Sequence, residues 1–320
     1  MNGCYLGADV GSTHTRVLVA DEHGNVVGYG ESGPGNHEVV GYDGLARALG
    51  DAVAQALGEA KIDKGQILGA GFGVSGYDWP SDREPTLEAV GTLGLEAPWE
   101  VVNDTLLGLL AGSSQGWGIV LISGSGCNCR GWDQDHQRQG RVTGEGPDMG
   151  EGAGGSELMR KVRQALAYQW TQRGPITALT PLMLEYAGAP NLPDLIEGLV
   201  HRRYRLGTAA APLVFQAAQH GDQVALDLLR WAGEELAELV KAVVRQLDFQ
   251  DLDFEVVMSG GMFAGGTLLI EPLKNSVHRL APGARFVRLE SPPVVGAVLL
   301  GMKAAGKSYI DARQQLKHWK

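Results

Sequence analysis

The sequence has few cysteines, no excess of basic residues and no long apolar run, and each of these excludes a class of protein. Three cysteines among 320 residues are too few for a disulfide framework, so we expect a reducing compartment. Lysine and arginine number 27 against 37 aspartates and glutamates, and the net charge of -10 argues against nucleic acid or an anionic membrane as the main partner. No uncharged apolar run reaches about 18 residues, and no signal peptide is visible. We therefore expect a cytoplasmic protein.

Two of the cysteines, Cys127 and Cys129, lie close enough in sequence to suggest a metal site. Two thiols without a second pair of ligands are far more often ordinary strand residues. Alternation along a strand places both on one face, with Asn128 between them on the other. We therefore predict strand residues here and no metal.

Glycine is abundant, with 47 residues that cluster at the ends of predicted strands. The first cluster follows a short apolar strand that runs into Asp9, and it contains Gly11, Ser12 and Thr13. Glycine lets the backbone approach an anion, and the hydroxyl and N–H groups of a tight turn can bind phosphate. Asp9 is suited to hold a hydrated divalent cation against that anion. The turn lacks the spacing of a P-loop or a dinucleotide-binding motif, and an ordinary hairpin turn remains the alternative.

The order of predicted elements repeats along the chain. Strands are predicted at 3–11, 15–21 and 25–31, followed by alternating helices and strands at 42–60, 67–74, 85–93, 99–102 and 106–111. Three strands return at 117–122, 128–132 and 138–142, followed by helices and strands at 157–170, 222–247, 254–258, 268–280, 285–289 and 294–304. This predicts two similar α/β domains, 1–114 and 115–320, with a cleft between them. The second has a helical insertion broken by prolines, and its last helix is a candidate to pack back on the first.

Asp104 follows the predicted strand at 99–102 and precedes an apolar helix. A carboxylate in this position suits a general base that accepts the proton of an attacking hydroxyl. It equally suits the N-cap of the helix. The residues alone leave both roles open.

Several short stretches, in this order and spacing, carry a resemblance to a known family. They are residues 7–16, 35–37, 73–76, 103–104, 121–130, 259–261 and 293–297. On these residues the chain resembles the superfamily of acetate and sugar kinases, Hsp70 and actin. Within it, the chain is similar to the branch that holds N-acetylglucosamine kinase and the BadF/BadG/BcrA/BcrD ATPases. The resemblance covers essentially the whole chain and implies two actin-like (ribonuclease H-like) domains with a nucleotide-binding cleft between them.

The resemblance implies ATP as the phosphoryl donor, with Mg²⁺. Asp9 would help place Mg²⁺ through water, in the role the family gives this position. ATP contacts are implied at three glycine-rich turns: Gly11, Ser12 and Thr13; Ser123, Gly124, Ser125 and Gly126; and Ser259, Gly260 and Gly261. The first two turns correspond to the phosphate loops, and the third to the adenosine loop.

The resemblance also implies a sugar site in which Asp104 is the catalytic base. The implied sugar contacts are Asn36, His37, Ser75, Gly76, Asp104, Asn128 and Glu151. Glu151 departs from the pattern, because the family commonly has Gly-Asp-Glu-Gly-Ser here. The added methylene moves the carboxylate by roughly 1.5 Å, which affects sugar specificity more than phosphotransfer. Glu145 and Asp148 are nearby carboxylates that could substitute.

The function that follows is an ATP-dependent kinase acting on N-acetylglucosamine or a related amino sugar, at the 6-hydroxyl. Relatives are often dimers, so a homodimer remains open, although no apolar stripe marks an interface. One alternative is a BadF-type ATPase that drives a conformational change in a partner protein. Those proteins bind an iron–sulfur cluster through cysteines at a subunit interface, and this sequence has no such motif. Another is a non-catalytic sugar sensor, but the presence of both Asp9 and Asp104 favours catalysis.

Overall fold

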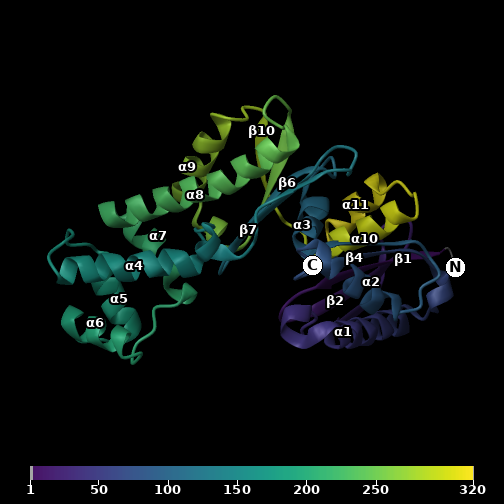
Figure 1. Ribbon diagram of the computed structural model, residues 1–320, viewed down its shortest axis with the longest axis horizontal. Helices are drawn as coiled ribbons and strands as arrows, with labels where there is room; N and C mark the ends of the chain where they lie inside the picture. The colour runs from purple at the N-terminus through teal and green to yellow at the C-terminus, as the bar shows by residue number, and fades with distance from the viewer. Residues whose placement is uncertain (1–2, 320) are drawn as a thin grey trace.

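The computed structural model describes residues 3–319, which form two lobes side by side (Figure 1). Each lobe contains one five-stranded sheet. The first has the order β3-β2-β1-β4-β5 and consists of β1 (Cys4–Val10), β2 (Thr15–Ala20), β3 (Val26–Ser32), β4 (Ile67–Val74) and β5 (Trp99–Asn103). The second has the order β10-β9-β6-β7-β8 and consists of β6 (Gly118–Ser123), β7 (Cys127–Trp132), β8 (Gln139–Arg141), β9 (Phe254–Ser259) and β10 (Ala284–Arg288).

The two sheets have the same topology. The central strand β1 pairs antiparallel with β2 and parallel with β4, and β6 pairs in the same way with β7 and β9. The outer strands continue this pattern, antiparallel on one side and parallel on the other. The predicted duplication of a three-strand unit is therefore confirmed. Each central strand ends in one of the first two glycine-rich turns.

The first lobe contains helices from both ends of the chain. They are α1 (His37–Ala60), α2 (Arg83–Gly91), α3 (Asp104–Gly112), α10 (Pro293–Ala304) and α11 (Ile310–Leu316). The last two, yellow in Figure 1, lie with the first sheet. α10 packs closely because Gly7 and Gly71 present no side chain: a Cβ on Gly7 would lie 2.2 Å from the backbone nitrogen of Val298.

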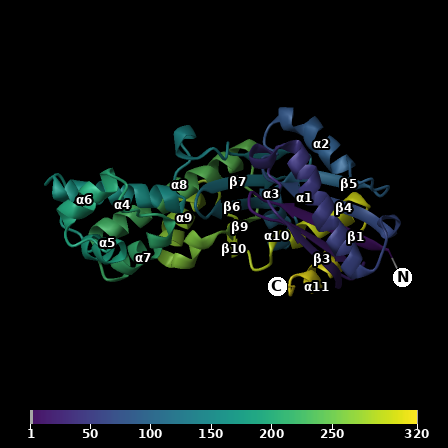
Figure 2. The same cartoon turned by 90° about the horizontal axis from the view of Figure 1, so that it is seen from below.

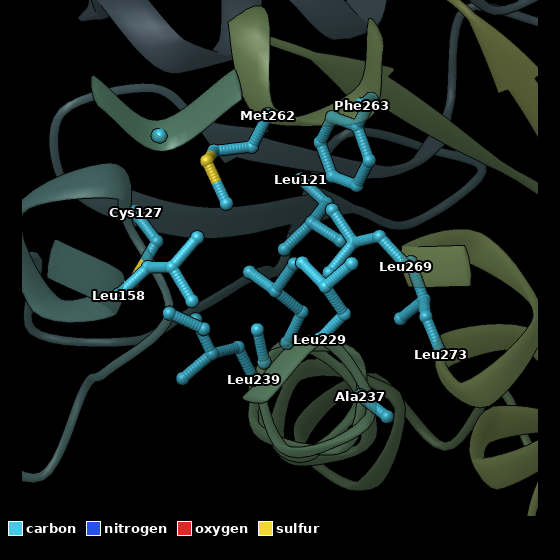
Figure 3. Close-up of a cluster of buried hydrophobic side chains, with 14 of the residues drawn as sticks. Leu121, Cys127, Leu158, Leu229, Ala237, Leu239, Met262, Phe263, Leu269 and Leu273 are labelled. Carbon is cyan, nitrogen blue, oxygen red and sulfur yellow. The ribbon is translucent and has the colours of Figure 1, made fainter. Parts of the chain in front are cut away.

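The second lobe has its core between its sheet and two long helices, α8 (Gln223–Leu247) and α9 (Thr267–His278). Figure 3 shows Leu121 of β6 and Leu229 of α8 pointing into one apolar cluster with Leu158 and Leu269. All four side chains are fully buried. This core fixes β6 and β7, and thereby the second glycine-rich turn.

Four further helices extend the second lobe away from the first (Figures 1 and 2). They are α4 (Gly155–Trp170), α5 (Leu179–Ala187), α6 (Leu192–Val200) and α7 (Ala211–Gln219). Pro181, Pro193 and Pro212 lie in the first turns of α5, α6 and α7, where backbone N–H groups have no intrahelical partner. Each of these three prolines thus marks the start of a new helix, and Pro175 and Pro190 lie in connections, so the helical region is divided into short segments as the sequence predicted.

The boundaries of the other elements lie close to the predicted ones, with two differences. The first is that α1 begins at His37 and not near residue 42, because the side chain of Asn36 caps it. Gly41, with a φ of 70°, interrupts the helical geometry of α1. The apolar spacing that predicted the rest of the helix therefore did not predict its first turn. The second is α11, which the sequence pattern did not predict.

The cysteines lie where they were predicted, with Cys127 and Cys129 in β7. All three cysteines are buried, and Cys127 and Cys129 are free thiols. Among residues 3–319, His, Cys, Asp and Glu side chains form no group of three or more that could hold a metal ion. No helix of the described chain has the length and apolar character needed to cross a membrane.

Candidate active site

The first glycine-rich turn, between β1 and β2, is tied to the loop that precedes α1. Gly11 donates its N–H to the carbonyl of His14 at 2.9 Å, and its own carbonyl accepts from Gly35 at 3.0 Å and from Asn36 at 3.3 Å. Ser12 and Thr13 are exposed. Their side chains are therefore accessible to a ligand, and their predicted contact with phosphate stays a prediction.

Asn36 links the turn, the loop and α1. Its Nδ2 donates to the hydroxyl of Ser12 at 3.0 Å and to that of Ser75 at 3.4 Å, while its Oδ1 accepts from the backbone of Glu38. The residue is 5% exposed. Asn36 thus orients the groups around it, and its predicted contact with a sugar stays a prediction.

His37 and Gly76 lie against Asn36. The ring of His37 stacks on Tyr42 with 4.4 Å between centroids, and its buried Nδ1 has no hydrogen-bond partner within the described residues. Gly76 has a φ of +82°, and a Cβ there would lie 2.7 Å from Oδ1 of Asn36. A side chain at position 76 would therefore displace Asn36.

Asp104 is the first residue of α3 and not its cap. The cap is Asn103, whose Oδ1 accepts from the backbone N–H of Thr105 at 3.0 Å. The interpretation of Asp104 as the N-cap is therefore wrong, because the preceding side chain already satisfies that amide. The Asp104 carboxylate instead interacts with Ser75, Asp78 and Arg130.

The pKa of Asp104 is raised to about 6, mainly by burial. The negative charge of Asp78 also contributes to the raised pKa, whereas the N–H of Thr105, the charge of Arg130 and the hydroxyl of Ser75 all oppose it. A carboxylate with this pKa is mostly ionised at pH 7 and binds a proton more strongly than a free aspartate does. These are the properties of a general base for a hydroxyl group.

Asp9 lies at the end of β1, close to Asp104. Its pKa is raised to about 7, mainly by burial and also by the charge of Asp104, while the charge of Arg16 opposes the shift. Two neighbouring carboxylates with raised pKa values form a region of negative potential that a cation would stabilise.

The second glycine-rich turn, between β6 and β7, is fixed by its own backbone and by the start of α4. Gly124 donates to the carbonyl of Gly126 and accepts from Gly155 at 2.8 Å. Ser123 is fully buried and donates its hydroxyl to the carbonyl of Ala153 at 2.8 Å. The turn is therefore rigid, and Ser123 contributes to its structure.

A cavity of about 570 Å³ opens beside this turn. Its wall includes Gly124, Ser125 and Gly261, which the sequence predicted as ATP contacts; Ser259 and Gly260 immediately precede Gly261. The opposite wall comes from residues that sequence reasoning missed: Thr208, Ala211, Pro212, Phe215, Gln216 and Gln219. They lie on and just before α7, and their pattern in the sequence is that of any amphipathic helix.

Asn128 and Glu151 meet at the loop after β8. The buried carboxylate of Glu151 accepts from the backbone N–H groups of Thr143 at 2.5 Å and Gly144 at 2.7 Å. Gly144 lies against the side chain of Asn128, which approaches the hydroxyl of Thr105 at 3.4 Å. Glu151 therefore holds the loop beside Asn128. The alternative carboxylates considered for its place, Glu145 and Asp148, are exposed.

Sequence reasoning also missed an ion pair that joins the lobes beside Asp104. Arg130 of β7 donates to the carboxylate of Asp78, which follows β4. Asn103 donates to the same carboxylate at 3.2 Å. Nothing in the local sequence marks either residue, because the pair forms only when the two sheets meet.

Two lobes with the same strand order, each with a glycine-rich turn at the end of its central strand, define the fold as the two-domain actin-like ATPase fold. The model of the BadF/BadG/BcrA/BcrD ATPase family matches residues 6–301, and the chain belongs to this family.

Relatives and a solved structure cover nearly the whole chain. The N-acetyl-D-glucosamine kinase of Dictyostelium discoideum is 26% identical over 317 residues, 94% of this chain and 98% of the relative. The N-acetylmuramic acid/N-acetylglucosamine kinase of Clostridium acetobutylicum is 25% identical over 301 residues, 92% of this chain and 97% of the relative. The structure of a ROK family glucokinase from Streptomyces griseus with glucose and AMPPNP has a TM-score of 0.56 at 21% identity, covering 95% of this chain and 100% of the other. This likeness supports the fold.

Proposed function

We propose that the protein is an ATP-dependent kinase that phosphorylates N-acetylglucosamine or a related amino sugar at its 6-hydroxyl group. The observation that carries the proposal is the meeting of Asp104, Ser75 and Asn36, which come from three separate elements. The family, and the two kinases that are similar over nearly the whole chain, support the same activity.

In this proposal Asp104 accepts the proton of the attacking sugar hydroxyl. Its pKa of about 6 suits that role near neutral pH. Ser75 and Arg130 hold the carboxylate, while Asn36 and Asn128 supply amide groups that can donate to and accept from sugar hydroxyls. The reaction then depends mainly on positioning and on neutralising the charge of the transferred phosphoryl group.

ATP would lie across the cleft between the two glycine-rich turns. The cavity beside Gly124, Ser125 and Gly261 is large enough for a nucleoside, and Phe215 offers it an apolar wall. Gly11, Ser12 and Thr13 would bind the terminal phosphates from the other lobe. Asp9 fits a Mg²⁺ site because its carboxylate lies beside that of Asp104. When bound, Mg²⁺ neutralises charge on the phosphates.

The test is ADP release by the purified protein with ATP and Mg²⁺, measured against a panel of hexoses and N-acetylhexosamines. We expect stimulation by an N-acetylhexosamine, and its loss in Asp104→Asn, which keeps the size of the side chain. ADP release that is indifferent to every sugar and to this substitution would instead favour an ATPase that drives a partner protein.

A further inference from the structure

A cavity of about 530 Å³ lies between the lobes, at the opposite end of α3 from Asp104. α3 spans Asp104–Gly112, so its two ends are about 12 Å apart. Its leucines pack against residues of both sheets, and the helix lies where the two lobes meet (Figure 1). The cavity is therefore separate from the acceptor site, with α3 between the two.

The chain passes between the lobes twice, at residues 113–117 and 289–292, and both crossings line this cavity. The segment around α11 is attached to each of them. Arg313 of α11 donates to the carbonyl of Leu110, just before the first crossing. The hydroxyl of Ser291, in the second crossing, donates to the carbonyl of Lys317 at 3.1 Å. Because a rotation of one lobe against the other must change the shape of the crossings, we call this space the hinge cavity.

The charged side chains that line the hinge cavity are three cations and two carboxylates, namely Arg288, Arg313, Lys317, Glu255 and Glu290. Both carboxylates already have partners. Glu255 accepts from the N–H and the hydroxyl of Ser114 and lies 3.9 Å from Arg285. Glu290 pairs with Lys317 at 3.4 Å. Arg288 and Arg313 remain without an ion pair in the part of the chain that the structure describes.

These two arginines come from different lobes. Arg288 ends β10, and its guanidinium lies over the ring of Phe263, 5.5 Å from the centroid. The buried Nε of Arg313 has no hydrogen-bond partner among residues 3–319, and Glu255 attracts its charge only from beyond ion-pair distance. Buried donors are nearly always paired in folded proteins. Planar guanidinium groups bind oxyanions such as phosphate through paired hydrogen bonds, so the two arginines suit a phosphate group.

The rest of the lining suits a group with several hydroxyls. Glu290, Gln314, Ser113 and Ser291 contribute carboxylate, amide and hydroxyl oxygens. Such oxygens accept hydrogen bonds from the hydroxyls of a sugar. The volume also lies in the range of small-molecule sites, roughly 300–1,000 Å³. The lining therefore fits a phosphorylated sugar better than phosphate alone.

We propose that the hinge cavity binds a phosphorylated sugar, with its phosphate on Arg288 and Arg313, and that this ligand inhibits the enzyme by holding the cleft open. The choice of ligand rests on the proposed kinase function, because a phosphorylated amino sugar is the product of that reaction. A phosphate that binds an arginine from each lobe draws the lobes together at this end of α3. It thereby separates them at the other end, where ATP and the sugar must meet. The shared chemistry is a phosphate group, and we assign its source to the sugar phosphate.

The first experiment measures kcat of the wild-type protein at saturating ATP and N-acetylglucosamine while N-acetylglucosamine 6-phosphate is added. A product that binds only at the acceptor site competes with the sugar and leaves kcat unchanged at saturation. We expect kcat to fall, because the hinge cavity stays available when the acceptor site is full. A kcat that stays constant or rises would overturn the inference.

The second experiment repeats this measurement in Arg288→Gln, Arg313→Gln and Arg313→Lys. The inhibition constant of the sugar phosphate should rise about tenfold in each glutamine variant, the effect of one charged hydrogen bond, and lysine should restore part of the inhibition. Arg245→Gln, on the exposed surface of α8, removes the same charge elsewhere and should leave the constant unchanged. Arg288 is exposed, so Arg288→Gln decides the matter alone if Arg313→Gln loosens α11. The same inhibition constant in the wild type and in Arg288→Gln would contradict the assignment.

Two further arms separate the possible failures. If inorganic phosphate inhibits the wild type as strongly as the sugar phosphate does, and Arg288→Gln resists both, the cavity binds a free anion and the assignment to a sugar is wrong. If no sugar is phosphorylated, the kinase proposal fails. Calorimetric titration with N-acetylglucosamine 6-phosphate, with excess N-acetylglucosamine filling the acceptor site, then decides the inference by itself, since equal affinities of the wild type and Arg288→Gln would overturn it.

Discussion

Arg130 and Asp78 form an ion pair that joins the two lobes directly beside Asp104. Burial raises the pKa of Asp78, and Arg130 lowers it. The charge of Asp78 raises the pKa of Asp104, and the charge of Arg130 lowers it. The pair therefore influences the proton affinity of the proposed base and also holds the lobes together at the acceptor site.

Removing the charge of Arg130 and removing the charge of Asp78 should shift the pH dependence of activity in opposite directions. Because the charge of Arg130 lowers the pKa of Asp104, Arg130→Met should move the acidic limb of the kcat/KM profile to higher pH. Asp78→Asn should move it to lower pH. Arg130→Met should also lower the free energy of unfolding by about 3–5 kcal/mol, since it leaves a buried carboxylate unpaired. pH–rate profiles and urea unfolding measure both effects, and shifts of the same sign in the two variants would contradict this account.

Asp9 should make the folded protein less stable as pH rises. Its pKa of about 7 lies above the unfolded value of about 3.9, so the folded state binds an extra proton between pH 4 and 7 and loses stability through that window. Without ligands, Asp9→Asn should raise the free energy of unfolding by about 1–3 kcal/mol at pH 8 and have almost no effect below pH 4.

A matched control for Asp9 is Asp21→Asn. Burial raises the pKa of Asp21, but hydrogen bonds from Asn25 and His23 outweigh it and lower the pKa overall. This variant should therefore lose stability at pH 8. Urea unfolding across pH 4–8 compares the two, and an effect of Asp9→Asn that does not change with pH would exclude a titration origin.

Gly76→Ala should impair sugar binding specifically. A Cβ at this position would lie 2.7 Å from Oδ1 of Asn36, so the substitution displaces that side chain. We expect KM for the sugar to rise by about tenfold, the size of one lost charged or well-placed hydrogen bond. Gly94→Ala is the control, because Gly94 also has a positive φ but nothing lies within 4 Å of its Cβ position. Both variants should lose about 1–2 kcal/mol of stability, and an equal rise of KM in both would mean that backbone strain is responsible.

Phe215→Leu should weaken ATP binding and leave sugar binding unchanged. Phe215 lines the larger cavity opposite the second glycine-rich turn. We expect KM for ATP to rise by about tenfold, with KM for the sugar within about twofold, because stacking and apolar contact with the base are reduced. Phe254→Leu removes an equally large buried ring that does not line the cavity. Comparable losses of ATP affinity in both variants would point to general loosening of the second lobe.

Glu151→Asp should reduce activity, although aspartate is the residue that the family pattern has. The carboxylate of Glu151 accepts from the backbone of Thr143 and Gly144, and a shorter side chain cannot keep both bonds from the same backbone position. The loop beside Asn128 would loosen, and KM for the sugar should rise. Glu151→Gln keeps the length and one acceptor oxygen, so it should be less affected. If Glu151→Asp instead binds sugar more tightly than the wild type, Glu151 contacts the sugar and is not mainly a support for the loop.

The repeated sheet could be predicted because short apolar runs such as β4, bounded by glycine-rich turns, form buried strands and few other structures. The sequence also predicted the glycine-rich turns and Asp104, which directly follow strands. The sequence could not distinguish Asp104 from Asn103 as the cap of α3, since aspartate and asparagine are both favoured at the N-cap position.

Contacts that form only between distant elements were beyond sequence reasoning. The pairing of Arg130 with Asp78 joins residues of different lobes, and Phe215 reaches the cavity from a helix with no distinctive motif. The hydrogen bonds of Asn36 with the hydroxyls of Ser12 and Ser75, and of Glu151 with the backbone of Thr143 and Gly144, are equally invisible in the sequence, because the fold brings these partners near.

The packing of α10 on β1 and β4 has a consequence for biosynthesis. Val294, Val295 and Val298 share a buried cluster with Tyr5 and Leu18, so the two ends of the chain build one hydrophobic core. During translation the first lobe must wait for residues near 300 to leave the ribosome, while the sheet of the second lobe is complete once residue 288 has emerged. The lobe that is encoded first is therefore the last to be finished.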